Sequence, residues 1–244
     1  ADWSDRIAAG AVPPAPPRPR GVERNVVTTM WEWGTEVDYI HDEIATDKRN
    51  PRVNANGPIY GALEASADYV PVLDPITHTA SRIPLPVRDP NMGAASGPPL
   101  QPSPYWGDEA IWDSKANAHN PMLDDQGRVW LTSRVRPPGD NPAFCREGSD
   151  HPSAKLFPTE RAGRHLAMYD PATEEMSLIN TCFGTHHLIF AEDENNTIWT
   201  SGGGQVIGWL NTKMYLETGD EEASQGWTPL ILDTNGNGRQ DEYV

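Results

Sequence analysis

The chain repeats one pattern of polar and apolar positions three times. In each copy a polar turn rich in Asn, Asp and Gly comes directly before an aliphatic residue and an aromatic residue. The copies occupy residues 50–60, 120–130 and 189–199, and their apolar pairs are Ile59-Tyr60, Val129-Trp130 and Ile198-Trp199. Gly and Asn adopt a left-handed backbone at the least cost, and the apolar pair suits a buried strand. The pattern predicts a turn that leads into a strand in every copy.

A second element follows each copy. It is a short apolar run that ends in a polar turn, at residues 72–77, 168–173 and 209–212, and the first two turns contain Asp-Pro. The recurring order of strand, polar turn, strand, Asp-Pro turn and strand indicates that one sheet is repeated as a unit. We therefore predict an all-β fold with at least three four-stranded β-propeller blades and long loops. Because propellers usually need four or more blades, further blades are expected from the same chain or from another.

Composition shifts suggest the boundaries of these units. Residues 1–25 form an N-terminal segment that ends in a proline-rich linker, and residues 26–244 hold the propeller blades. The repeats run over about 26–87, 105–182 and 186–244, with a Pro-, Gly- and Ser-rich connector after the first. A run such as Val12–Pro19 excludes helix and central strand, so we expect a stiff connector there.

Charge and hydropathy narrow the class of partner. The 244 residues carry a formal net charge of −16, which argues against nucleic acid and anionic membrane surfaces. No stretch approaches the roughly 20 apolar residues of a membrane span, so membrane insertion is not expected. The nine tryptophans suit short strands with large buried anchors.

The two cysteines flank the second Asp-Pro strand. A disulfide between Cys145 and Cys182 would pin the insertion around residues 135–162 to the sheet. The alternative is two separate buried thiols. Together with the calcium-type loop described next, the disulfide predicts a secreted or periplasmic protein.

A calcium-type loop lies near the end of the sequence. Oxygen side chains occupy positions 1, 3, 5 and 9, Gly occupies position 6, and a backbone carbonyl serves position 7. In order these residues are Asp233, Asn235, Asn237, Asp241, Gly236 and Arg239. Calcium requires six or more hard oxygen ligands, and alternate residues around a Gly bend provide them. Val244 stands at the twelfth position, where Glu242 would have to substitute. The alternative is an Asn-Gly hairpin turn.

Histidines form a second constellation of candidate ligands. His119 directly precedes the second copy, and His186 and His187 precede the third. The corresponding place in the first copy is Arg49, and slightly upstream lie His41, Asp42 and Glu43. Imidazoles and carboxylates bind a second divalent metal ion or act as general acid and base. The alternative is that these histidines only brace loops.

The remaining histidines are weaker candidates for a functional site. His151 has Ser and Asp as close sequence neighbours, but catalytic triads are assembled from distant positions, so we do not expect catalysis there. His78 and His165 lie beside the Asp-Pro strands and are expected at the surface.

The segment from His119 through Asp124, Gly127, Val129-Trp130 and Thr132 resembles the blade motif of virginiamycin B (streptogramin) lyase-like propellers. The segment from His187 through Asp193, Ile198-Trp199 and Thr200 is similar to it as well. In that family a divalent metal and a His general base near the axis open a macrocyclic ester by elimination. The resemblance implies a propeller with His119 and His187 in the matching positions. The wider layout also resembles secreted bacterial propellers that follow a cytochrome-like segment, which implies an oxidoreductase with a separate redox domain.

Two classes of function follow. The first is a metal-dependent lyase or hydrolase that uses His119, His186 and His187 at the axis on a small-molecule or polymer ligand. The second is a non-catalytic binding or assembly module, in which the long insertions form the interface.

Overall fold

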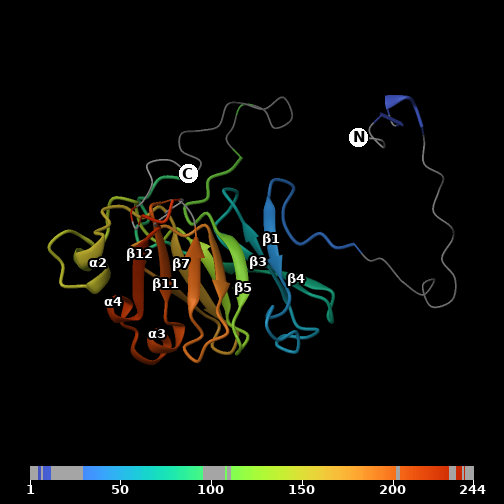
Figure 1. Ribbon diagram of the computed structural model, residues 1–244. Coiled ribbons are helices and arrows are strands. Elements are labelled where there is room, and N and C mark those ends of the chain that lie inside the picture. Colours follow the sequence, from blue (N-terminus) through green and yellow to red (C-terminus); the bar gives the residue numbers. More distant parts are fainter. Residues whose placement is uncertain are drawn as a thin grey trace. The chain divides into compact units, whose positions relative to one another are not determined.

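The computed structural model describes residues 5–6, 8–11, 30–95, 108, 111–201, 204–230, 235–237 and 239 (Figure 1). The chain divides into two compact units, Ala1–Trp31 and Glu32–Val244. The first contains a short helical stretch in which the amide of Ala9 donates to the carbonyl of Asp5 at 3.0 Å. All the sheets belong to the second unit.

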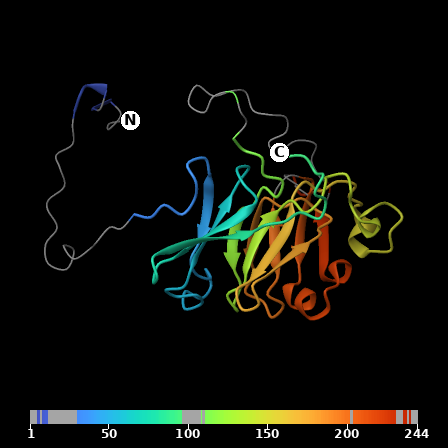
Figure 2. The ribbon, with the colours of Figure 1, turned by 180° about the vertical axis from the view of Figure 1, so that it is seen from behind.

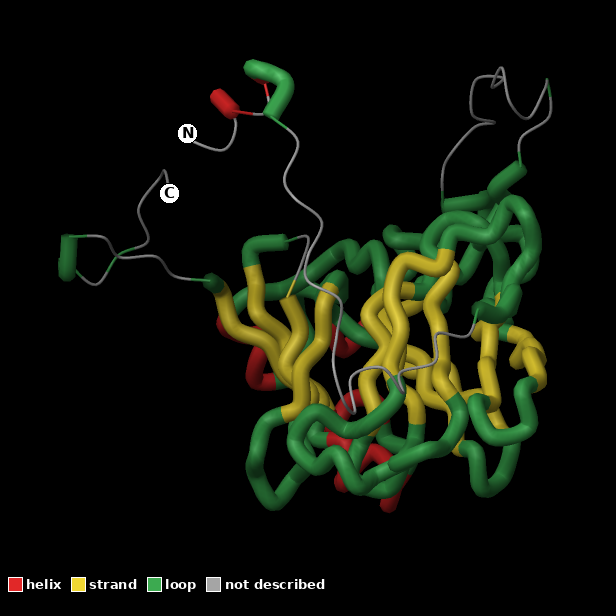
Figure 3. Tube along the Cα trace, turned by 90° about the vertical axis from the view of Figure 1, so that its right-hand side faces the viewer, coloured by secondary structure: helices red, strands yellow, loops and turns green. Residues whose placement is uncertain are grey.

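Strands dominate the second unit. Three antiparallel sheets each contain four strands that are consecutive in the chain, and Figure 3 shows loops at both ends of these strands. Sheet 1 consists of β1 (Ile40–Ile44), β2 (Ile59–Leu63), β3 (Tyr69–Asp74) and β4 (Thr79–Pro84). Sheet 2 consists of β5 (His119–Leu123), β6 (Val129–Ser133), β7 (His165–Asp170) and β8 (Glu175–Ile179). Sheet 3 consists of β9 (His187–Phe190), β10 (Ile198–Ser201), β11 (Val206–Leu210) and β12 (Gln225–Pro229).

The three predicted polar turns all join the first strand of a sheet to the second. Each turn contains at least one Asn or Gly with a left-handed backbone, namely Asn54 and Asn56 in sheet 1, Gly127 in sheet 2 and Asn196 in sheet 3. The prediction of three repeated four-stranded units is confirmed.

The second repeated element is also a turn in the first two sheets. The carboxylates of Asp74 and Asp170 accept hydrogen bonds from the amides of Ile76 (2.7 Å) and Ala172 (2.8 Å). In sheet 3 the strand β11 leads instead into the helix α3 (Thr212–Thr218). Asn211 caps the N-terminus of this helix, because its side-chain oxygen accepts a hydrogen bond from the amide of Met214 at 3.0 Å. A second helix, α4 (Glu221–Ser224), then connects to β12.

Sheet 2 lies between sheets 1 and 3, as Figures 1 and 2 both show. Its β6 residue Val129 packs with Tyr60 of sheet 1, while the next residue, Trp130, packs with Phe190 and Ile198 of sheet 3. Alternate residues of one strand thus fill two different cores, as expected for a strand that is buried on both faces.

A long insertion between β6 and β7 carries the short helices η2 (Ala143–Cys145) and α2 (Pro152–Leu156). The disulfide between Cys145 and Cys182 joins it to the segment after β8, with a Cα–Cα distance of 5.2 Å, so this prediction is confirmed. Phe183 and Trp227 pack around the disulfide. In the part of the chain that the structure describes, no helix is long and apolar enough to span a bilayer.

Candidate metal centre

A histidine stands at or near the start of the first strand of every sheet. His41 is the second residue of β1, His119 begins β5, and His187 begins β9 directly after His186. The strand β5 contacts both β1 and β9, so the same ends of the three strands come together. The stacking of the sheets therefore gathers imidazoles that are far apart in the sequence.

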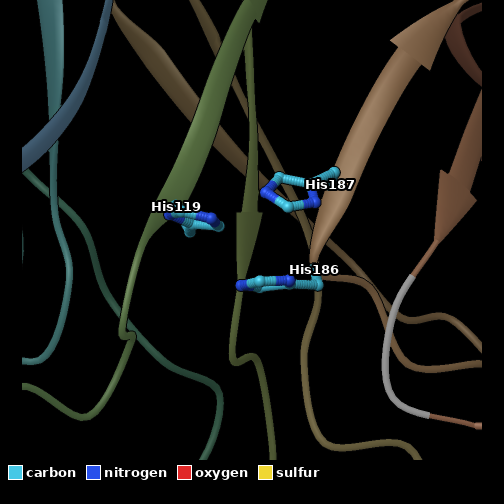
Figure 4. Close-up of side chains that lie close together, drawn as sticks. All are labelled: His119, His186 and His187. Carbon is cyan, nitrogen blue, oxygen red and sulfur yellow. The ribbon is translucent and has the colours of Figure 1, made fainter. Parts of the chain in front are cut away.

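Three of these rings form a compact group, and Figure 4 shows them facing one another. The rings of His119 and His186 stack with centroids 4.6 Å apart and an interplanar angle of 18°. The centroids of His186 and His187 are 4.2 Å apart, and those of His119 and His187 are 5.1 Å apart. One nitrogen from each ring lies within 4.8 Å of the others.

A second group shares His119 and adds residues of sheet 1. Its members are His41, Asp42 and His119. The Asp42 carboxylate lies 2.7 Å from Nδ1 of His119 and 3.1 Å from Nδ1 of His41. Glu64, directly after β2, lies 3.8 Å from Nε2 of His41 and accepts a hydrogen bond from Arg164 at 2.8 Å. Four imidazoles and two carboxylates thus lie close together, in two groups that share His119.

Two β-bulges aim these side chains. The register of β1 against β2 shifts between Ile40 and Asp42, and that of β5 against β6 shifts between His119 and Met122. A bulge places one extra residue opposite its partner strand and re-aims nearby side chains. This explains why the neighbours His41 and Asp42 both reach the cluster, although strand alternation would send them to opposite faces.

Asn120, in the bulge of β5, holds the three sheets in place around the cluster. Its backbone is left-handed, with φ of 47°. Its amide donates to Asp42 of sheet 1 at 2.9 Å, and its side-chain oxygen accepts from the amide of Leu188 of sheet 3 at 2.7 Å. The hydroxyl of Thr132 lies within hydrogen-bond distance of the carbonyls of His119 (3.0 Å) and His186 (3.1 Å).

The electrostatics keep the central imidazole neutral. Burial lowers the pKa of His119 to about 4, and Arg164 and His186 act in the same direction against the carboxylates of Asp42 and Glu64. Burial, with the charges of His187 and Arg164, also lowers the pKa of His186. Neutral imidazole is the form that binds metal ions.

The carboxylates remain ionised. Burial alone would raise the pKa of Asp42, but the hydrogen bonds from His41 and the Asn120 amide and the histidine charges together lower it. The pKa of Glu64 is also lowered, because Arg164 outweighs the effect of burial.

The donor set fits a divalent transition metal. His119 is only 1% exposed, and its Nε2 has no hydrogen-bond partner within the described structure, while its Nδ1 lies 2.7 Å from the Asp42 carboxylate. A buried polar atom without a partner costs free energy. Zn–N bonds of about 2.0–2.1 Å place tetrahedral ligand nitrogens about 3.3 Å apart, and the nitrogens of the three histidines lie within 4.8 Å of one another.

Not every predicted ligand joins the cluster. Glu43 is exposed and belongs to neither group, and Glu64 supplies a carboxylate that the sequence did not reveal. Arg49 lies beyond the far end of β1, where it donates to the carbonyl of Ala191 at 2.9 Å and forms an ion pair with Asp47. The residue of sheet 1 that corresponds to His119 is therefore His41.

The calcium-type loop is described only in part, and Asp233 and Asp241 lie outside the described residues. The side-chain oxygens of Asn235 and Asn237 accept hydrogen bonds from the amides two residues on, at 3.1 and 2.8 Å. Gly236 between them is left-handed, with φ of 76°. Calcium binding stays a prediction.

Three further histidines lie apart from the cluster. His151 caps α2 through the amide of Ser153 and stacks on Trp227. His78 is exposed in the β3–β4 turn, as predicted. The surface prediction for His165 is wrong: its side chain is fully buried, and its Nδ1 accepts from the amide of Val135 at 3.0 Å.

Comparisons with models of known protein families, with curated proteins and with solved structures find no match for this chain.

Proposed function

We propose that the three sheets are blades of a β-propeller and that the histidine cluster binds a divalent transition metal for a lyase or hydrolase reaction. The observation that supports this most directly is the group of His119, His186 and His187, whose nitrogens approach within 4.8 Å from two different sheets. The position of this group at the ends of the first strands fits the axial end of propeller blades.

The surroundings of the cluster suit such chemistry. A bound ion would act as a Lewis acid on a carbonyl or ester oxygen of a small-molecule or polymer ligand. Of the protein's own groups, His41 is exposed and in contact with Asp42, which orients its Nδ1 at 3.1 Å. This pair suits proton transfer at the open side of the cluster, while the buried His119 serves as a ligand.

Metal binding is tested by calorimetric titration of the chelator-treated protein with Zn²⁺, Mn²⁺ and Mg²⁺. We expect one tight transition-metal site that is lost in His119→Ala and weakened in His187→Ala. The matched control is His78→Ala, because His78 is an exposed histidine outside the cluster. If wild type and His119→Ala bind the metals equally, the cluster is not the site.

Activity is a separate measurement. Macrocyclic and linear esters, incubated with the metal-loaded protein, are analysed for elimination or hydrolysis products by mass spectrometry. We expect turnover that disappears in His41→Ala even though the metal is retained. Metal binding without turnover of either ester class would remove the enzymatic part of the proposal.

A ligand-binding module is the second candidate, because a cavity of about 520 Å³ lies where the insertion meets α4 and β12. Its lining includes Trp209 and the carboxylates of Asp150, Asp220 and Glu222. An aromatic side chain beside several carboxylates suits a cationic ligand. Screening cationic ligands against wild type and Trp209→Ala distinguishes this function, since that variant leaves the histidines unchanged.

We also propose calcium in the 233–242 loop and a secreted or periplasmic location, which the disulfide supports. Loss of thermal stability with a chelator, absent in Asp233→Ala, tests the calcium site. Export of the natural gene product, followed by fractionation of the cells, tests the location.

A further inference from the structure

The exposed face of sheet 3 carries the same row of side chains that is buried in sheets 1 and 2. In sheet 1 the cross-strand row is Ile44, Tyr60 and Val72. In sheet 2 it is Met122, Trp130 and Met168. In sheet 3 it is Ile189, Trp199 and Trp209. We call these the aromatic rows.

Burial of the aromatic rows differs sharply. The central residues Tyr60 and Trp130 are 4% and 0% exposed, because the next sheet covers each of them. In sheet 3, Trp199 is 41% and Ile189 is 60% exposed. A groove of about 270 Å³ runs along this face beside His187. An apolar row that is covered twice and open once indicates a missing partner.

The two internal interfaces show what covers an aromatic row. Sheet 2 covers the first row with Leu123, Val129 and Tyr169, which are cross-strand neighbours. Sheet 3 covers the second row in the same way with Phe190, Ile198 and Leu210. We call these the covering rows. Each lies on the face of its sheet that is opposite to its aromatic row.

Sheet 1 has a covering row as well. Ile59, Leu73 and Ala80 are cross-strand neighbours on β2, β3 and β4, and they correspond to Val129, Tyr169 and Met176 of sheet 2. Ala80 is exposed and Ile59 is half-buried, whereas Leu73 is only 6% exposed and Trp33 already lies against Gly61 on this face. One chain therefore offers an open aromatic row at one end of its stack and, at the other, a covering row whose outer residues Ile59 and Ala80 remain accessible.

We propose that two copies of this chain associate head to tail, with the aromatic row of sheet 3 in each copy packed on the covering row of sheet 1 in the other. This inference rests on the propeller arrangement proposed above but not on the metal. A head-to-tail contact closes into a ring when its rotation allows it. Two copies place six sheets around one axis, which lies within the usual range of four to eight blades.

The experiment is light scattering of the purified, folded chain during size-exclusion chromatography. We expect 53.8 kDa, twice the chain mass of 26.9 kDa, with more dimer at higher salt because both copies are strongly acidic. Trp199→Arg and Ala80→Arg should each reduce the mass to 26.9 kDa. Leu156→Arg, at a site 64% exposed on α2, is the matched control and should remain dimeric.

Mixing the two disruptive variants tests the head-to-tail arrangement. A mixture of Trp199→Arg and Ala80→Arg keeps one intact interface and should recover the dimer. Three outcomes overturn the proposal. The first is a wild-type protein that stays monomeric up to its solubility limit, and the second is an open-ended polymer. The third is a dimer that only Trp199→Arg disrupts, because this result indicates that two copies of sheet 3 pair face to face. Metal titration of monomeric Ala80→Arg keeps the proposals separate, because all cluster residues come from one chain and binding should persist.

Discussion

Replacement of Asp124 by Ala is expected to be among the more damaging single changes in the turns. Asp124 follows β5 and is fully buried. One of its oxygens accepts the amides of Gln126 (2.9 Å) and Arg128 (3.0 Å). The other accepts the indole N–H of Trp130 at 3.0 Å and the Arg128 guanidinium at 2.7 Å. The substitution removes an acceptor that four donors share.

The expected magnitude follows from which donors can find water. Trp130 is 0% exposed, so its N–H would be left unsatisfied at a cost of roughly 1–3 kcal/mol. The turn amides lose bonds worth about 1 kcal/mol each. Arg128 reaches solvent and adds little. We expect Asp124→Ala to lower the free energy of unfolding by about 3–5 kcal/mol, the range for breaking a buried pair.

The matched control is the equivalent residue of the third repeat. Asp193 is exposed, and its carboxylate accepts the amide of Thr197 at 2.9 Å. Its replacement by Ala should cost about 1 kcal/mol. Urea denaturation of both variants, with equal m values, measures the difference. Equal losses in the two variants would refute the argument that burial of the Trp130 N–H sets the cost.

Three other predictions follow from the same structure. Asn120→Ala should weaken metal binding about 10–100-fold, because it removes the acceptor of the Leu188 amide beside the cluster and places Ala in a left-handed backbone. Calorimetric titration measures the affinity, and an unchanged affinity would exclude a positioning role for Asn120. Replacing both cysteines by Ser should lower the free energy of unfolding by about 4 kcal/mol in the chain-entropy model, since the disulfide closes a loop over 37 residues. Denaturation with and without reductant measures this loss, and a loss under about 1 kcal/mol would contradict the prediction. Burial, with the charges of three arginines, holds the pKa of His165 well below its ordinary value of 6.5, so its contribution to stability is complete above about pH 6.5 and is lost as the pH falls toward the folded-state pKa. The decline in unfolding free energy below that pH should be shallower in His165→Gln, and an identical pH dependence would count against it.

The local features of the fold could be predicted from the sequence because each is encoded within a few residues. A turn that needs a left-handed backbone uses Asn or Gly, as at Asn196 and Gly127, and the structure has positive φ at both. The position of His41 could not be predicted in this way. The long segment between β1 and β2 displaces the first turn from its strand, so that alignment on the turns selects Arg49 in place of His41.

The rest of the candidate site depends on long-range geometry. Glu64 and Arg164 are brought together from different sheets, and no local pattern marks either of them. The bulges that re-aim Asp42 and the histidines arise from the pairing of strands and are not visible as a periodicity. His165 illustrates the same limit, since it is buried and its Nδ1 accepts a hydrogen bond from Val135, which lies 30 residues away in the sequence.

The aromatic rows connect the stability of the stack with the candidate site. Trp130 is buried where sheet 3 packs on sheet 2, and this packing also brings His186 and His187 to His119. A change that separates these two sheets would therefore remove ligands as well as core contacts. Trp199 has the same place in its repeat as Trp130, but no sheet of the described residues covers it and it is 41% exposed. Burial of an aromatic row and completion of the site at the strand ends are, for this architecture, two consequences of the same packing step.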